Sequence, residues 1–309
     1  MNTQANERSA GAAGGPRAVE SGTWSLGDRS VYRLGFGAMR LTHTADGSPS
    51  DRDRAVAVLR AAVESGVNHV DTAAFYFSAL RSANELIGRA LAPYAEDLTI
   101  ATKVGPGRRT DGSWWWARPE ELRGQVEENL RQLGRDHLDL VNLRVPPNAA
   151  TSSVAEHFGA LAEVREAGLV RHLGVSNVTA GQLAEARAVA PVVCVQNAYG
   201  IGADPAAHAL VETCGEAGIA FVPFFAIAGA SREGGVPADD DPVVHEVARE
   251  RGLSAAQVRL AWSLTRGPHV LAIPGTGNPA HLRENVAAGA IRLTGAEMSR
   301  LAGGGPDAG

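Results

Sequence analysis

The stretch LDLVNLRV (residues 138–145), together with the two segments after it, decides the fold. It is a short, apolar, β-branched run of the kind that forms a buried strand. The next segment, SVAEHFGALAEVREAG (153–168), has the pattern of an amphipathic helix ending in Gly, and RHLGVSN (171–177) is a second strand-like run. A strand, a helix and a strand in this order predict two parallel strands joined by a right-handed crossover.

The same alternation extends along the chain from residue 34. Eight strand-like runs occur: LGFGAM (34–39), NHVDTA (68–73), LTIATKV (98–104), LDLVNLRV (138–145), RHLGVSN (171–177), VVCVQNAY (192–199), AFVPFFA (220–226) and HVLAIPG (269–275). Further helix-like segments between them are DRAVAVLRAAVESG (53–66), ANELIGRALAPY (83–94) and PEELRGQVEENLRQLG (119–134). Eight strand–helix units predict an α/β fold, a single (β/α)8 TIM barrel over residues 23–309.

Three other segments have expected places around this barrel. TWSLGDRSVYRL (23–34) carries Gly-Asp between two alternating runs, which predicts a type II′ hairpin that plugs the bottom of the barrel. The long segments GPGRRTDGSWWWARP (105–119) and GASREGGVPADDDP (229–242) come after the third and seventh strands. They are expected at the top, where active sites of such barrels lie.

Composition excludes several classes of protein. The net charge of the 309 residues is −5 and the basic residues are scattered, so no nucleic-acid partner is expected. No apolar run is long enough to span a membrane. Residues 1–22 lack the apolar region of a signal peptide and are predicted to form a disordered tail. Cys194 and Cys214 lack metal-site spacing, so we expect core packing in a reduced, cytoplasmic protein that binds no metal.

Polar residues stand where buried parallel strands end. Asp71 and, after a short loop, Tyr76 come after the second strand, Lys103 ends the third, and Arg144 ends the fourth. Period two along the fourth strand puts Arg144 on the same face as Leu140 and Asn142. If that face lines the barrel, all four polar side chains converge at its mouth.

An Asp, a Tyr and a Lys at one mouth form a chemically sensible set. A free tyrosine has a pKa of about 10, and a nearby ammonium favours its anion. Asp71 would pair with Lys103 and hold it in place, and Tyr76 would act as general acid toward a developing alkoxide. The alternative is an ordinary buried ion pair with an unrelated loop tyrosine.

Several motifs, in order, resemble the aldo-keto reductase superfamily in its bacterial form, from about residue 23 to 302. They are GFGAMRL, GVNHVDTAAFY…ANELIGRAL, TIATKVG, LDLVNLR, AEVREAGLVRHLGVSN, VVCVQNAYG and IPGTGNPAHLRENVAA. The resemblance implies a (β/α)8 barrel that binds NADPH without a Rossmann domain and reduces a small-molecule carbonyl. It also implies Asp71, Tyr76 and Lys103 as catalytic residues, with Tyr76 the proton donor.

The resemblance also implies a cofactor site. Ser176, Asn177 and Gln196 fall where the family binds the nicotinamide carboxamide, and Phe224 falls where an aromatic ring stacks on the nicotinamide. Asn278 and Pro279 begin a helix whose N-terminus suits a phosphate. The positions matching the adenosine and 2′-phosphate contacts are Gly275, Thr276, His281, Glu284 and Asn285, and Met39 and Arg40 are weaker candidates near cofactor or substrate.

Two cofactor positions differ from the commonest family pattern. Gly275 stands where a lysine often follows the proline, and His281 stands where an arginine is frequent. Loss of a fixed charge weakens the electrostatic case for a 2′-phosphate, because His is only partly cationic at neutral pH. NADP(H) remains the expected cofactor, since other branches of the family share the PGT…H pattern.

The fourth catalytic position, usually a histidine, is Arg144 in this chain. An arginine is always charged and cannot relay a proton, but its planar fork can bind a carbonyl oxygen, an enolate or a carboxylate. We expect its charge to lower the pKa of Tyr76 further and to favour an anionic or polarised carbonyl, such as a keto acid, a quinone or a polyketide-like ring. Two alternatives are that Arg144 merely pairs with a carboxylate, and that the protein is a catalytically weak NADP(H)-binding sensor or regulatory subunit.

The tryptophan run Trp114, Trp115 and Trp116 also allows two interpretations. The indoles either cover the mouth and favour flat or apolar substrates, or they anchor their loop on the outer helices. The direction of the reaction, the substrate and the oligomeric state do not follow from the sequence.

Overall fold

A parallel sheet forms the centre of the computed structural model, which describes residues 15–44, 48–109, 111–224, 226–227 and 241–303. Its seven strands have the spatial order β13-β12-β11-β10-β7-β4-β3. Their bounds are β3 (Phe36–Gly37), β4 (His69–Asp71), β7 (Thr99–Val104), β10 (Leu138–Arg144), β11 (Val170–Ser176), β12 (Cys194–Gln196) and β13 (Ala220–Phe221).

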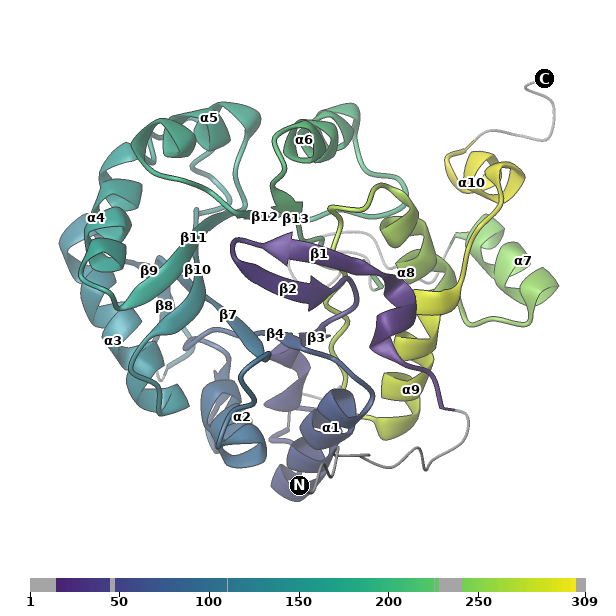
Figure 1. Ribbon diagram of the computed structural model, residues 1–309, viewed down its shortest axis with the longest axis horizontal. Coiled ribbons are helices and arrows are strands. Elements are labelled where there is room, and N and C mark those ends of the chain that lie inside the picture. The colour runs from purple at the N-terminus through teal and green to yellow at the C-terminus, as the bar shows by residue number, and fades with distance from the viewer. Residues whose placement is uncertain (1–14, 45–47, 110, 225, 228–240, 304–309) are drawn as a thin grey trace, which may run out of the picture.

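The eighth predicted strand closes the sheet. Val270 forms a parallel bridge to Phe221 of β13, and Ala272 forms one to Leu34, just before β3. The amide of Gly35 donates to the carbonyl of Ala272 at 2.8 Å. The two edges of the sheet are thereby joined, and the predicted (β/α)8 barrel is confirmed (Figure 1).

Helices surround this sheet (Figure 1). They are α1 (Arg52–Glu64), α2 (Ala83–Leu91), α3 (Leu122–Leu133), α4 (Ala155–Glu166), α5 (Ala180–Val189), α6 (Pro205–Glu216), α7 (Pro242–Arg251), α8 (Ala255–Thr265), α9 (Pro279–Ala287) and α10 (Gly295–Leu301). The apolar faces of the four predicted helices, α1 to α4, pack on the outside of the strands, for example through Leu59 and Phe158. Gly134 ends α3 in the left-handed conformation, at φ 65°, as its predicted C-cap.

The predicted plug is present as the antiparallel hairpin of β1 (Thr23–Leu26) and β2 (Arg29–Tyr32). Gly27 has φ 67°, as the first turn position of a type II′ hairpin requires. Leu26 and Val31 are buried in a cluster with interior residues of the barrel, including Leu140 and Leu271. The hairpin lies across the end of the barrel (Figure 1).

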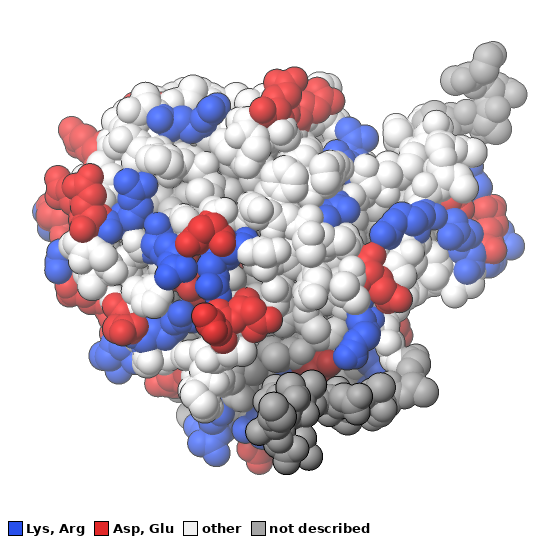
Figure 2. Space-filling view, viewed as in Figure 1, with Lys and Arg blue, Asp and Glu red and all other residues white. Residues whose placement is uncertain are grey.

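On the face of the molecule seen in this view, acidic and basic residues are interspersed (Figure 2).

The predicted tail differs from the structure in its last residues. Ala18–Ser21 form a 3-10 helix, η1, in which Ala18 and Ser21 are buried. The hydroxyl of Ser21 accepts from the amide of Leu34 at 3.0 Å. Small residues give little local signal, and this burial depends on contacts with distant segments. Residues 1–14, and 229–240 of the long segment after the seventh strand, lie outside the described residues.

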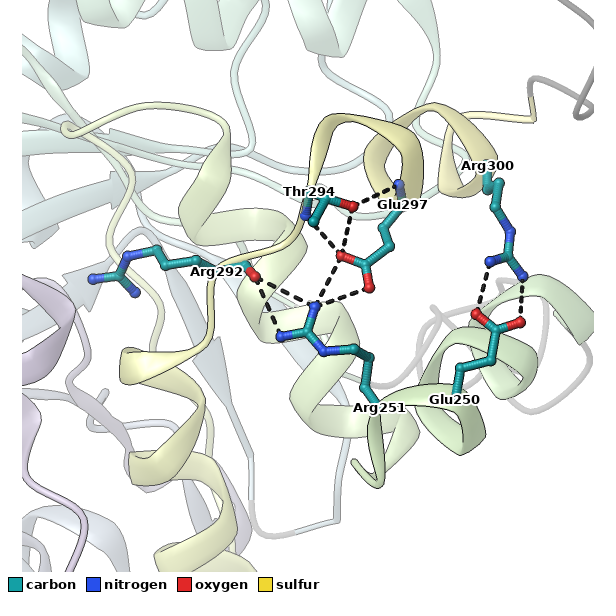
Figure 3. Close-up of polar contacts among 6 residues, drawn as sticks. All are labelled: Glu250, Arg251, Arg292, Thr294, Glu297 and Arg300. Atoms are coloured by element: carbon teal, nitrogen blue, oxygen red, sulfur yellow. Dashed lines mark hydrogen bonds and ion pairs between the residues drawn. The ribbon is translucent and has the colours of Figure 1, made fainter.

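Ion pairs hold the C-terminal helix α10 against α7 (Figure 3). Arg251 lies 2.8 Å from Glu297, and Arg300 lies 2.8 Å from Glu250. Thr294 and Glu297 form a capping box at the start of α10. None of the helices within the described ranges is long and apolar enough to cross a membrane.

Candidate active site

Three of the polar residues at the strand ends are brought together by β4 and β7. The ammonium of Lys103 donates to Asp71 Oδ1 at 2.6 Å and to the carbonyl of Thr72 at 3.1 Å. The side chains of Lys103 and Asp71 are only 2% and 6% exposed. Lys103 Nζ also lies 5.0 Å from the centroid of the Tyr76 ring, so the ammonium is shared between a carboxylate and a phenol.

Strand β10 brings the fourth residue to the same mouth. Leu140 belongs to the interior cluster of the barrel, whereas Val141 and Leu143 pack outward against the helices. Asn142 and Arg144 continue the inward face, and Arg144 is half-buried at the end of the strand. The period-two alternation therefore places Arg144 at the mouth, on the side of the barrel opposite to the hairpin plug.

The acidity of Tyr76 differs from the expectation. Burial raises the pKa of this phenol above its usual value, and the charge of Asp71 acts in the same direction. Lys103 and Arg144 lower the pKa, as predicted, but they do not outweigh burial. The predicted net lowering of the Tyr76 pKa is therefore wrong.

The pKa of Lys103 shows why the ammonium stays charged inside the barrel. Burial acts to lower the pKa of this amine, because a charged group is poorly solvated there. The facing carboxylate of Asp71, and then Tyr76, act to raise it, and the net result is a pKa above the usual value. Lys103 therefore remains an ammonium, which can support a proton donor beside it.

Gln196 makes a contact that sequence reasoning missed. Its Nε2 donates to Asp71 Oδ2 at 2.8 Å across the barrel, so both carboxylate oxygens are engaged. Its Oε1 is buried and has no hydrogen-bond partner among the described residues. A buried acceptor without a partner is costly, so this oxygen fits an N–H donor such as that of a carboxamide.

The other expected nicotinamide contacts lie beside Gln196. Ser176 ends β11 fully buried, opposite Gln196 in the strand register. Asn177 has φ 59° and is the one non-glycine residue with positive φ in the described part of the chain. Its side chain donates to the carbonyl of Val145 at 2.9 Å. Backbone strain of this kind persists where a site requires it, which fits a binding role for this turn.

The guanidinium of Arg144 lies against this same group of residues. Its Nη1 is 3.5 Å from the hydroxyl oxygen of Ser176. Its central carbon lies 4.9 Å from the centroid of the Phe224 ring. A fixed positive charge therefore contacts two of the residues expected to hold the nicotinamide.

The expected phosphate end of the site is the start of α9. Asn278 caps the helix by accepting from the amide of Ala280 at 2.9 Å, and Pro279 occupies the first helical position. Thr276 accepts from the amide of Asn278 at 3.0 Å. The first amides of a helix attract an anion. Of the remaining residues expected here, Asn285 is buried, His281 and Glu284 are exposed, and Met39 and Arg40 are half-buried in the 3-10 helix η2 (Ala38–Leu41).

Gly275 lies where the two ends of the barrel sheet meet. A Cβ atom built on Gly275 would overlap the backbone carbonyl of Gly37. Many family members have a lysine at this position. In this chain the backbones of Gly275 and Gly37 lie too close together for a side chain. Any side chain at position 275 would require β3 and the segment after residue 272 to separate.

The tryptophans divide between the two interpretations. They form β9 (Trp114–Trp116), which pairs with β8 (Pro106–Arg108). Trp114 is 53% exposed, and its ring lies 5.7 Å from that of Phe75, which in turn lies 5.1 Å from that of Tyr76. Trp115 is half-buried against Gly107 and the outer core. Trp114 therefore borders the mouth, whereas Trp115 anchors its hairpin; Trp116 is half-buried opposite Pro106.

Known proteins resemble this chain over nearly its whole length. Residues 33–303 match the aldo/keto reductase family. Pyridoxine 4-dehydrogenase of Escherichia coli is 45% identical over 291 residues, which cover 92% of this chain and 99% of that enzyme. A thermostable aldo-keto reductase solved with the inhibitor epalrestat superposes with a TM-score of 0.76 at 31% identity, covering 92% of this chain and 99% of the other. An aldo/keto reductase of Klebsiella pneumoniae in complex with NADP and acetate gives a TM-score of 0.70 at 26% identity, with 88% and 90% covered. The chain therefore belongs to the aldo/keto reductase family.

Proposed function

We propose that this protein is an NADP(H)-dependent oxidoreductase that interconverts a small aldehyde or ketone and its alcohol. The observation that carries the proposal is the buried Lys103 ammonium, held 2.6 Å from Asp71 and 5.0 Å from the Tyr76 ring centroid. A purely structural ion pair would not require a tyrosine such as Tyr76 beside the ammonium. Family membership supports the same chemistry.

Tyr76 donates the proton in this proposal. NADPH, when bound, supplies the hydride for the carbonyl carbon. As negative charge develops on the carbonyl oxygen, the phenol of Tyr76 protonates it, and the neighbouring Lys103 ammonium stabilises the phenolate that remains. The raised pKa of Tyr76 keeps the phenol protonated before the reaction. Asp71 fixes the ammonium, and Gln196 fixes Asp71.

The chain's own residues fit the cofactor. Gln196 offers a buried, unsatisfied acceptor oxygen for the carboxamide, with Ser176 and Asn177 beside it. Phe224 places its ring beside the Arg144 guanidinium at the same end of the barrel, and the start of α9, capped by Asn278, offers the positive end of its helix dipole to a phosphate. We assign the adenosine end to Gly275, Thr276, His281, Glu284 and Asn285.

We further propose that the substrate is a ring aldehyde with an acidic hydroxyl group beside it, as in pyridoxal. Arg144 offers a fixed charge and a planar fork of donors at the mouth, which suits an oxygen that is already anionic. In pyridoxal the phenolic oxygen is adjacent to the aldehyde, so one guanidinium can reach both. The 45% identity to an enzyme named pyridoxine 4-dehydrogenase supports this choice over a keto acid, a quinone or a polyketide-like ring. Trp114, near Tyr76 through Phe75, would cover such a flat ring.

The test compares NADPH oxidation with pyridoxal and with pyridine-4-carbaldehyde, which lacks the hydroxyl group. We expect Tyr76→Phe to reduce kcat by about a hundredfold or more for both aldehydes, because the proton donor is lost. We expect Arg144→His to reduce kcat/KM for pyridoxal at least about tenfold more than for pyridine-4-carbaldehyde. Equal losses on the two aldehydes would refute the assigned role of Arg144.

The same assay distinguishes the enzyme from a sensor. A protein that binds NADPH but oxidises it with none of a panel of carbonyls would favour the alternative of an NADP(H)-binding regulatory subunit. Retained turnover in Tyr76→Phe would refute Tyr76 as proton donor while leaving the reductase activity in place.

A further inference from the structure

Arg108 lies on the rim of the barrel mouth. It ends β8, which follows the carboxyl end of β7, the strand that carries Lys103. Its Nη1 donates to the backbone carbonyl of Phe77 at 3.2 Å. Phe77 directly follows Tyr76 in the chain, so this nitrogen lies within about 10 Å of the Tyr76 Cα atom. The guanidinium is therefore close enough to the proposed proton donor to contact the far end of a small substrate.

Aromatic rings hold this guanidinium in place. Its central carbon lies 5.6 Å from the centroid of the Phe77 ring and 6.0 Å from that of the Trp114 ring. Trp114 leads on to Tyr76 through Phe75, with successive ring centroids 5.7 and 5.1 Å apart. Ring faces attract a guanidinium but leave the N–H groups at its edge available to other partners. The rings thus fix the position of the charge without neutralising it.

The charge of Arg108 is not paired within the part of the chain that the structure describes. None of the carboxylates described there forms an ion pair with Arg108, and the Phe77 carbonyl is the only acceptor that its N–H groups reach among these residues. The side chain is half-buried, so solvent reaches only part of it. A positioned guanidinium suits an anionic ligand, because carboxylate and phosphate groups accept two parallel hydrogen bonds from its planar fork.

We propose that Arg108 binds a carboxylate or phosphate group of the substrate, at the end of the molecule away from the carbonyl that Tyr76 protonates. The inference rests on the proposed function, because it requires a carbonyl substrate beside Tyr76. Arg144 contacts Ser176 of β11, whereas Arg108 contacts residues next to β7 and β4, farther along the sheet. The two arginines would therefore contact different parts of the substrate.

The test compares kcat/KM for NADPH oxidation with two pairs of aldehydes. 4-Carboxybenzaldehyde and its methyl ester differ in a carboxylate charge, and pyridoxal 5′-phosphate and pyridoxal differ in a phosphate group. A charged hydrogen bond at a half-buried site should raise kcat/KM of wild type about tenfold for the anionic member of at least one pair. The pair that shows the preference identifies the group that Arg108 binds.

Three variants locate the origin of this preference. Arg108→Gln should lower kcat/KM for the preferred anionic aldehyde about tenfold and have a much smaller effect on its uncharged partner. Arg108→Lys keeps the charge but loses the planar fork, so it should retain part of the preference. Arg109→Gln is the matched control. It removes the same charge from the next residue, whose side chain is exposed and stacks on none of the described rings, and it should leave the preference unchanged.

Several outcomes would overturn the inference. Equal kcat/KM values within both pairs in wild type would do so without any variant. A preference that persists in Arg108→Gln would place the anionic group elsewhere, equal losses on both members of a pair would show a structural role, and an equal loss in Arg109→Gln would show a general charge effect. Failure of the proposed function has a different signature, since none of the four aldehydes would then support NADPH oxidation, and the inference would fail with it.

Discussion

The buried pair of Asp71 and Lys103 gives the sharpest test of the site. Their charged atoms are 2.6 Å apart, and their side chains are 6% and 2% exposed. Replacement of one partner leaves the other charge buried without its counterion, which costs about 3–5 kcal/mol of unfolding free energy. Asp71→Asn and Lys103→Met should each show a loss of this size. The double variant buries neither charge, so its loss should be much smaller than the sum of the two single losses.

The unfolding free energy of wild type and that of Asp71→Asn should change with pH in opposite directions. In wild type the pKa of Lys103 is raised, so its stabilising contribution is complete below the unfolded value of about 10.4 and is lost as the pH rises through the folded pKa. In Asp71→Asn, burial of the amine is no longer opposed by the carboxylate, and the folded pKa should fall below the unfolded one. Stability of this variant should then increase with pH up to about 10.4, opposite to wild type.

Urea unfolding of the protein without cofactor, followed by circular dichroism, measures both effects. The exposed pair of Arg123 and Glu127 on α3, 2.9 Å apart, is the control, and its disruption should cost less than about 0.5 kcal/mol. A double variant that loses the full sum of the single losses would show that the two charges do not stabilise each other. Parallel pH dependences of wild type and Asp71→Asn would show that the carboxylate is not what keeps the pKa of Lys103 high.

Two further predictions concern other parts of the barrel. Gly275→Ala should lower the unfolding free energy by about 1–3 kcal/mol, since its Cβ would overlap the Gly37 carbonyl, whereas Gly277→Ala, whose nearest contact is 3.8 Å away, should have little effect on the melting temperature. The hydrogen bond from His172 lowers the pKa of Asp28 in the hairpin, so its small stabilising contribution is present above the unfolded value of about 3.9 and is lost as the pH falls through the folded pKa. Asp28→Asn should therefore reduce the acid-induced decrease in melting temperature, and an unchanged acid transition would contradict this.

Long strands were easier to predict than short ones. LDLVNLRV predicts β10 almost to the residue, because its alternation continues over seven residues. VVCVQNAY and AFVPFFA predict strands of eight and seven residues, but among their described residues only Cys194–Gln196 and Ala220–Phe221 form strands, followed by one isolated bridge between Ala198 and Phe224. Apolar residues next to the assigned strands, such as Val192, Tyr199 and Val222, are buried as well, so composition alone does not distinguish them from strand residues.

Residue type and the alternation along the strands were enough to predict part of the candidate site. Polar residues at the ends of inward faces identified Asp71, Lys103 and Arg144. The net pKa shift of Tyr76 was not predictable, since it depends on burial, and sequence shows only the charges. The bond from Gln196 to Asp71 joins residues 125 positions apart and requires knowledge of which strands face each other across the barrel.

The β1–β2 hairpin also determines the order in which ligands can come and go. Leu26 and Val31 close one end of the barrel, and side chains such as Leu140 fill the space above them. A molecule that enters at the mouth cannot pass through and has to leave by the same opening. Cofactor and carbonyl therefore enter through the same opening of the barrel. The ligand that binds deeper has to bind first and dissociate last. In this way the hairpin, although it lies far from the catalytic residues, leads to ordered binding and ordered release of the two ligands.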